Sequence, residues 1–217
     1  MSPRLTTAVR ASLLGLALGS TLLVPSASLA QVPAQVTAPV AAPVASSAAA
    51  GSGCGVHARR AGLPPRSVWL AKVRKKLAGA NAYLDAHAAD AARPALVLDI
   101  DNTSLQTHYR WPKPVRPTLR VAKHAVQLGY TVFFVTGRTQ SSADSVRPQL
   151  SAAGYRYADV YGRPKGQGLA VSKQANRAKI VARGYTVVMD IGNRKTDLWG
   201  DNVGHGIKLP SFHGLLS

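Results

Sequence analysis

Two aspartates stand one residue apart near the middle of this chain, directly after an apolar run. The run Ala95-Leu96-Val97-Leu98 predicts a buried strand, and Asp99-Ile100-Asp101-Asn102-Thr103 follows it. Neighbouring carboxylates repel, so a bound cation or a division into one ionised and one protonated acid would keep them together. One acid could then serve as nucleophile or ligand and the other as proton donor. The alternative is a polar turn, which Asp, Asn and Thr favour.

A second apolar run ends in a pattern suited to phosphate. Thr131-Val132-Phe133-Phe134-Val135 leads into Thr136-Gly137-Arg138. A glycine lets the backbone approach a phosphoryl group closely, and a hydroxyl can donate a hydrogen bond to it. The alternative is an ordinary strand-to-helix turn in which Thr136 caps the helix that follows.

A third apolar run, Thr186-Val187-Val188-Met189, leads into a segment that carries Asp190, Asn193 and Asp197. Oxygen ligands without a usable Cys or His cluster favour a hard cation such as Mg2+. Lys173 lies in a helical segment between the second and third runs, where it could balance the acids and a phosphoryl group. Its alternative is a solvated helix face.

Taken in order, these motifs resemble the haloacid dehalogenase (HAD) superfamily, and within it the class B acid phosphatase and vegetative-storage-protein group, subfamily IIIB. The resemblance spans roughly residues 60–217. It is carried by LVLDIDNTSL at 96–105, FFVTGR at 133–138, SKQANRAKIVARGY at 172–185, DIGNRKTDL at 190–198 and IKLP at 207–210.

The resemblance implies a role for each motif. Asp99 would be the nucleophile, Asp101 the general acid and base, and Lys173 the stabilising lysine. Thr136, Gly137 and Arg138 would bind the substrate phosphate. The implied Mg2+ ligands are Asp99, Asp101, Asn193 and Asp197.

Two departures bear on these roles. Asn193 stands where the family pattern has its first acid, so the site loses a negative charge and weaker metal binding is expected. Lys165 lies in a Gly-containing loop and rivals Lys173, whose spacing to Gly184-Tyr185 matches the family. Asp190 is expected to be structural.

The elements that would position these residues alternate in type. Helices are predicted over 66–92, 118–129, 140–153 and 169–183, and strands over 95–100, 131–135, 186–191 and 206–209. This alternation predicts a Rossmann-like three-layer α/β/α parallel sheet, the HAD-like fold, in a domain over 61–217. Residues 102–117 are predicted to form a short cap, in which His108, Tyr109 and Trp111 either contact substrate or pack a Pro-rich loop.

The charge composition favours some classes of binding partner over others. Lys and Arg total 27 against 9 acidic residues, for a formal charge of +18. This excess would attract a small phosphomonoester substrate, and it is compatible with association with an anionic cell envelope. Nucleic acid is disfavoured, because the few aromatics do not alternate with basic residues.

The first 60 residues differ in character from the rest. Arg4 and Arg10 precede the apolar stretch 11–24, and small residues end at Ala30, so residues 1–30 are expected to be a cleaved signal peptide. The alternative is an uncleaved anchor. Residues 31–60 form an Ala/Pro-rich linker expected to be disordered. Cys54, the only cysteine, cannot form an intrachain disulfide.

The sequence therefore predicts a secreted, Mg2+-dependent acid phosphatase with a phospho-aspartate intermediate, an extracellular location and no membrane span after processing. Two alternatives remain open. One is a catalytically weak HAD-fold binding or storage protein, which Asn193 motivates. The other is a basic envelope- or nucleic-acid-binding module.

Overall fold

A computed structural model describes residues 62–216 of the chain. The predicted signal peptide, the linker and Cys54 lie outside the described residues. The described part forms a five-stranded parallel sheet in the order β3-β2-β1-β4-β5. The strands are β1 (Pro94–Leu98), β2 (Thr131–Thr139), β3 (Asp159–Arg163), β4 (Thr186–Gly192) and β5 (His205–Lys208).

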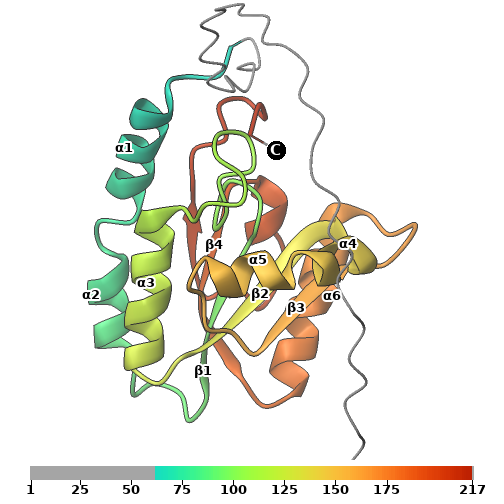
Figure 1. The fold of residues 1–217 in the computed structure, drawn as a ribbon. Coiled ribbons are helices and arrows are strands. Elements are labelled where there is room, and N and C mark those ends of the chain that lie inside the picture. Colours follow the sequence, from blue (N-terminus) through green and yellow to red (C-terminus); the bar gives the residue numbers. More distant parts are fainter. Residues whose placement is uncertain (1–61, 217) are drawn as a thin grey trace, which may run out of the picture. The chain divides into compact units, whose positions relative to one another are not determined.

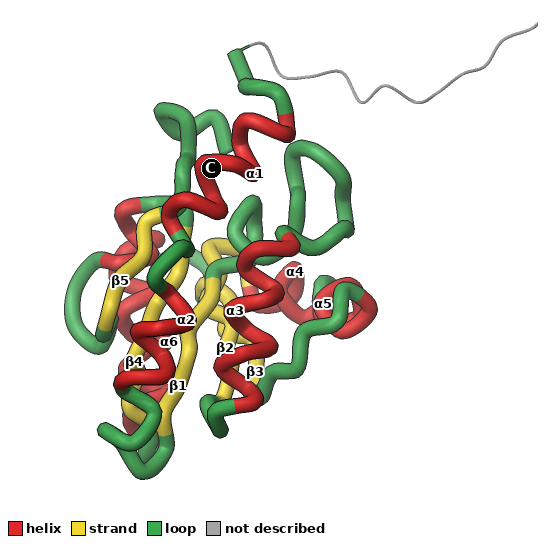
Figure 2. Tube along the Cα trace, turned by 90° about the vertical axis from the view of Figure 1, so that its left-hand side faces the viewer, coloured by secondary structure: helices red, strands yellow, loops and turns green. Residues whose placement is uncertain are grey.

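Helices cover both faces of this sheet (Figures 1 and 2). They are α1 (Arg66–Lys76), α2 (Ala80–Ala86), α3 (Arg116–Gln127), α4 (Gln140–Ser145), α5 (Arg147–Ala152) and α6 (Leu169–Ala182), with a short 3-10 helix η1 (Lys195–Leu198). The three-layer α/β/α parallel fold expected from the sequence is confirmed. No helix among the described residues is long and apolar enough to cross a bilayer.

The alternation of side chains along β1 divides the core in two. Leu96 and Leu98 pack with the apolar faces of α1, α2, α3 and α5. Ala95 and Val97 point the other way and pack with Ile180 of α6. Every residue of β1 is buried, as expected for a central strand of a parallel sheet covered on both faces.

Three expectations about the elements need correction. The helix predicted over 66–92 is two helices, α1 and α2, separated at Leu77–Gly79. The helix predicted near 140–153 is likewise divided into α4 and α5. No strand was predicted between 153 and 169, yet this stretch contains β3, which pairs with β2 at the edge of the sheet.

The strand ends place the motifs. Because all five strands are parallel, the carboxyl ends of β1, β2 and β4 lie at one edge of the sheet, and the segments after them meet there. The C-terminal segment joins the loop that follows β1, since Asn102 Nδ2 donates a hydrogen bond to the carbonyl of Leu216 at 3.0 Å.

Candidate active site

The loop after β1 holds Asp99 in a fixed position. The Asp99 amide donates to the Ile191 carbonyl of β4 at 2.9 Å, and Ser104 Oγ donates to the Asp99 carbonyl at 2.7 Å. Thr103 Oγ1 donates to Asp99 Oδ2 at 3.1 Å. The sequence DIDNTS thus supplies both the carboxylate and the hydroxyls that orient it.

Lys173 reaches this carboxylate from α6. Its ammonium donates to Asp99 Oδ1 at 2.9 Å and also to Asp197 Oδ1. All three side chains are buried, so the cation neutralises two acids in a region with little water. The rival Lys165 is exposed and makes no such contact.

Burial dominates the ionisation of this group. It raises the pKa of Asp99 to about 6, although the attraction of Lys173 opposes the shift. Burial alone would lower the pKa of Lys173, but the charges of Asp99 and Asp197 outweigh it and raise that pKa. Lys173 is therefore a permanent cation at physiological pH.

Asp101 lies beside Asp99 but has different partners. Arg138 Nε and Nη2 donate to its two oxygens at 2.9 and 2.6 Å, and Thr107 Oγ1 donates to Oδ1 at 2.8 Å. Burial acts to raise the pKa of Asp101, yet these hydrogen bonds and the guanidinium charge lower it overall. Arg138 was expected to bind substrate, but in the structure its guanidinium is bound to Asp101, the expected proton donor.

The end of β2 brings Thr136 and Gly137 to different depths. Thr136 is fully buried, and its hydroxyl accepts a hydrogen bond from the Arg138 amide at 3.3 Å. Gly137 lines the site, and a Cβ there would approach Leu169 Cδ2 to 2.8 Å. A side chain at Gly137 would therefore push against α6 near Lys173.

The segment after β4 carries the remaining predicted ligands. Asn193 Nδ2 donates to the carbonyls of Asp101 and Leu216, each at 2.8 Å. Asp197 Oδ2 accepts from the Arg194 amide at 2.7 Å. A Cβ on Gly192 would meet the Asp197 side chain at 2.2 Å, so only glycine lets Asp197 fold back onto the strand end.

A cavity of about 330 Å³ opens at this edge of the sheet. Of the residues predicted from sequence, it is lined by Asp99, Asp101, Gly137, Arg138, Lys173 and Asn193. Thr136 and Asp197 lie behind its wall. Four further lining residues were not predicted: Arg163, Leu169, Arg194 and Leu216. Arg194 directly follows Asn193 and Arg163 lies two residues before Lys165, whereas nothing in the local sequence pointed to Leu216.

The donor set fits Mg2+ in its chemistry. Among residues 62–216, no three His, Cys, Asp or Glu side chains form a metal cluster. The cavity is nevertheless lined by Asp99, Asp101 and Asn193, which together offer carboxylate, carbonyl and amide oxygens, the ligands that hard cations prefer. The Asp197 carboxylate accepts hydrogen bonds from Lys173 and from the Arg194 amide, and it does not line the cavity. Its charge would therefore influence a metal in the cavity without direct coordination.

The predicted cap, 102–117, packs mainly through its aromatic residues. Tyr109 stacks on Trp69 with ring centroids 4.6 Å apart, and its hydroxyl donates to the Pro64 carbonyl at 3.0 Å. The ring of His108 pairs with Asn102. Trp111 is half-exposed, with the Arg138 guanidinium 5.3 Å from its ring centroid. None of the three aromatics lines the cavity.

A second buried ion pair joins α6 to β4 next to the site. Arg177 of α6 pairs with Asp190 of β4 at 3.4 Å and donates to the Asp197 carbonyl at 2.7 Å. Burial raises the pKa of Asp190 well above its usual value, although Arg177 opposes the shift. Asp190 lies outside the cavity lining, in line with the structural position expected for it.

Comparison with solved structures shows the same fold in bacterial acid phosphatases. The class C acid phosphatase from Bacillus anthracis matches with a TM-score of 0.52 and 18% identity, covering 63% of this chain and 67% of that one. The same enzyme with tungstate bound matches with a TM-score of 0.50 and 19% identity, covering 62% and 67%. No curated protein matches the chain.

Comparison with family models gives a narrower result. Residues 107–212 match the model described as HAD superfamily, subfamily IIIB (Acid phosphatase). This stretch contains β2 through β5 and the motifs at the ends of β2 and β4, whereas β1 and Asp99 lie N-terminal to it. The resemblance inferred from the motifs is confirmed: residues 107–212 of this chain are similar to the HAD superfamily, subfamily IIIB, the acid phosphatases.

Proposed function

We propose that this hydrolase of phosphoric monoesters is an exported, Mg2+-dependent acid phosphatase that works through a phospho-Asp99 intermediate. The match to the acid phosphatase family model supports phosphatase activity, and the geometry supports the mechanism. The observation that carries it is the placement of Asp99 in the cavity wall, with Lys173 Nζ 2.9 Å from its carboxylate and Asp101 in the same wall.

In the first step, an oxygen of Asp99 attacks the phosphorus of the bound ester. The bond from phosphorus to the ester oxygen breaks, and the leaving alcohol takes a proton from Asp101. Lys173 offsets the charge that develops on the phosphoryl oxygens. Gly137 leaves space for those oxygens to approach the backbone at the end of β2.

In the second step, water attacks the phosphorus of phospho-Asp99. Asp101, now ionised, accepts a proton from that water. The bond between phosphorus and the Asp99 oxygen breaks, which releases inorganic phosphate and restores the carboxylate. One acid thus serves as donor in the first step and acceptor in the second.

Because Arg138 contacts Asp101, binding of substrate phosphate to Arg138 would change the protonation of Asp101. In the structure its guanidinium holds both oxygens of Asp101 and stabilises the ionised form. A phosphoryl dianion in the cavity would compete for this guanidinium, because Arg binds phosphate in the same bidentate manner. Asp101 would then regain the proton that the first step requires.

Mg2+ would be held by Asp99, the Asp101 carbonyl and the amide oxygen of Asn193, where it would supply positive charge that shields the nucleophile from the anionic substrate. Asn193 would have to turn its amide, since its nitrogen now donates to the Asp101 carbonyl. Asp197 would orient Lys173.

The test is turnover of a chromogenic phosphate monoester by the purified protein, with Mg2+ and with EDTA. Asp99→Asn preserves the size of the side chain but removes the nucleophile, so we expect turnover to fall to background while the unfolding curve stays cooperative. Asp144→Asn makes the same chemical change on α4, away from the cavity, and should retain full activity. Retained turnover in Asp99→Asn would contradict the mechanism.

A weakly active binding or storage protein is the second candidate, and the amide at Asn193 favours it. Asn193→Asp separates the two, because it restores a negative charge beside the proposed metal. A rise from near-zero to robust turnover would identify the native chain as an impaired enzyme. An active native chain that gains little would exclude this second candidate.

The proposed location and partners follow from the first 60 residues and from the charge. A cleaved signal at 1–30 would export the protein, and its basic surface would then meet an anionic cell envelope. Small phosphate esters would be the substrates.

A further inference from the structure

One side of α3 presents three basic side chains and a glutamine to solvent. Arg116, Arg120, Lys123 and Gln127 are all exposed, and their spacing of four, three and four residues places them along one face of the helix. The opposite face is buried against the sheet. We call these four residues the α3 stripe.

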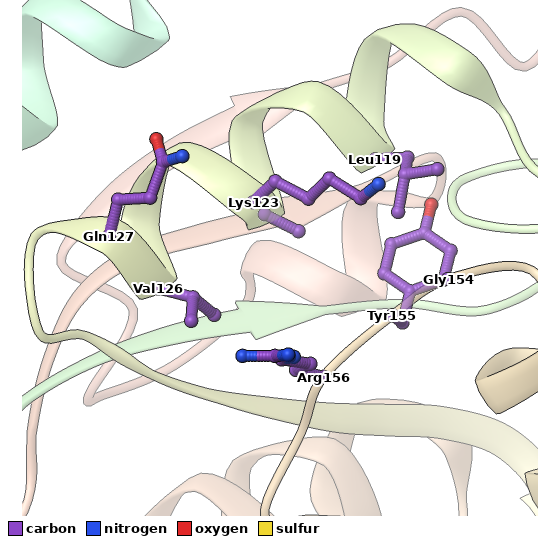
Figure 3. A pocket seen from close by; sticks show the side chains of 8 residues that line it. Leu119, Lys123, Val126, Gln127, Gly154, Tyr155 and Arg156 are labelled. Atoms are coloured by element: carbon purple, nitrogen blue, oxygen red, sulfur yellow. The ribbon is translucent and has the colours of Figure 1, made fainter.

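A groove of about 280 Å³ runs along one side of the α3 stripe, between α3 and residues 154–156 (Figure 3). Leu119, Ala122 and Val126 give it an apolar side. Lys123 and Arg156 contribute cations from the two walls, and Figure 3 shows both side chains in the groove. Gly154 has a φ of +92°, a left-handed conformation that glycine adopts without strain, and it forms the turn that carries Arg156 to this wall.

A second groove of about 200 Å³ runs between α1 and α3. Arg74 of α1 and Arg120 of α3 line it, together with the apolar Leu77, Pro117 and Val121. The α3 stripe is therefore bordered by two grooves that each combine two cations with apolar carbon.

These cations are not neutralised by the rest of the domain. Within the described residues, six of the nine aspartates pair with Lys or Arg and two more contact histidines, and none of these contacts uses Arg74, Arg120, Lys123 or Arg156. Asp85 is the acid that contacts α3, and it is bound to His124 at 2.7 Å. The surface therefore keeps a positive potential. At about 0.1 M salt an anion within about 10 Å of the surface still experiences it.

We propose that the α3 stripe and its two grooves form a docking surface for a linear phosphodiester polymer of the cell envelope. A polymer suits the surface better than a single anion, because Arg116 to Lys123 spans roughly 10 Å of helix and the grooves extend it on both sides. Phosphates would contact the cations, and the carbon linkers would lie on Leu119, Ala122 and Val126.

The chemistry of the surface selects a polymer without bases. Binding of single-stranded nucleic acid relies on aromatic side chains that stack on bases. The aromatic residue lining these grooves is Tyr155, and it is buried, with its hydroxyl bonded to the Ser104 carbonyl at 3.0 Å. The inference rests on the export proposed above and is independent of the catalytic mechanism.

The test is fluorescence anisotropy of labelled poly(glycerol phosphate) titrated with the full chain at several NaCl concentrations. Affinity should fall steeply with salt, because each phosphate contact releases counterions. Lys123→Gln with Arg156→Gln should weaken binding by about tenfold at low salt and reduce the slope of log K against log salt by roughly two.

Lys165→Gln with Lys179→Gln is the matched control, since it removes the same charge from the α6 side of the molecule. It should change affinity less than about twofold, because distant exposed charges are screened. Equal weakening by both pairs would show diffuse attraction and overturn the proposal, as would absence of binding. Tighter binding of single-stranded DNA of equal charge would overturn it in favour of a nucleic-acid surface. Turnover of the chromogenic ester should be unchanged in both pairs, so failure of docking would leave the phosphatase proposal intact.

Discussion

At the scale of single residues, the site depends on one cation shared by two acids. Lys173 holds Asp99 and Asp197 together in a region where unpaired charge is costly. It therefore acts in stability as well as in chemistry.

Lys173→Gln should lower the free energy of unfolding by about 3 kcal/mol at pH 7, because two buried carboxylates lose their counter-charge. The pKa of Asp99, which burial already raises, would rise further without the attraction of the Lys173 ammonium. Between the unfolded and the folded pKa of this carboxyl the folded variant binds more protons than the unfolded chain, so its stability falls as pH rises from the first value to the second. The deficit against the native chain should be smaller at pH 4.5 than at pH 7.

Urea unfolding at both pH values, without added metal, measures this effect. Lys165→Gln serves as control, because it removes an exposed lysine and should change stability by less than about 0.5 kcal/mol. A deficit that is the same at pH 4.5 and pH 7 would mean that lost packing, rather than charge, accounts for the effect.

At the scale of elements, α6 fastens the segment that follows β4. The 3-10 helix η1 has four residues and is too short to hold itself. Arg177 supplies the missing support, because its guanidinium donates to the carbonyls of Asp197, Trp199 and Asp201. This clamp fixes Asp197 and, through it, Lys173.

Arg177→Met should therefore release the segment 197–201. We expect its backbone amides to exchange hydrogen at least about tenfold faster, and stability to fall by about 3–5 kcal/mol because Asp190 loses its partner. Hydrogen exchange followed by mass spectrometry measures the first effect. Arg183→Met, an exposed change just after the end of α6, should leave exchange in this segment unchanged. Uniform acceleration over the whole domain would instead indicate general destabilisation.

The elements also show what the sequence could reveal. The strands β1, β2 and β4 are continuous apolar runs, so their existence and the meeting of their ends were predictable. The edge strand β3 was missed because it is short and only Val160 and Gly162 are buried in it. The helix over 66–92 was predicted too long because Ala-rich sequence resumes directly after Gly79, although glycine commonly ends a helix.

The sequence could not predict that the C-terminal segment forms part of the cavity wall. Leu216 enters the cavity wall because its carbonyl accepts hydrogen bonds from Asn102 and Asn193, which lie 114 and 23 residues away along the chain. The pairing of Arg138 with Asp101 is also a long-range contact. Motif spacing identified both residues but could not show that the Arg138 guanidinium donates hydrogen bonds to both oxygens of Asp101.

At the scale of the whole molecule, the dominant feature is uncompensated positive charge. The chain carries 27 Lys and Arg against 9 acids, and most of the acids are already used in ion pairs within the domain. The remaining cations repel one another in the compact state more than in the expanded unfolded chain. Self-repulsion should therefore limit stability at low ionic strength.

Raising NaCl from 10 to 150 mM should accordingly raise the melting temperature, by about 2–4 °C if screening recovers about 1 kcal/mol. Thermal unfolding followed by circular dichroism measures the shift, with an equal osmolarity of glucose as the uncharged control. Lys123→Gln with Arg156→Gln removes two cations from one crowded face, so this variant should melt higher than the native chain at 10 mM and gain less from salt. A melting temperature that falls with NaCl would mean that the surface ion pairs contribute more to stability than the repulsion among the unpaired cations removes.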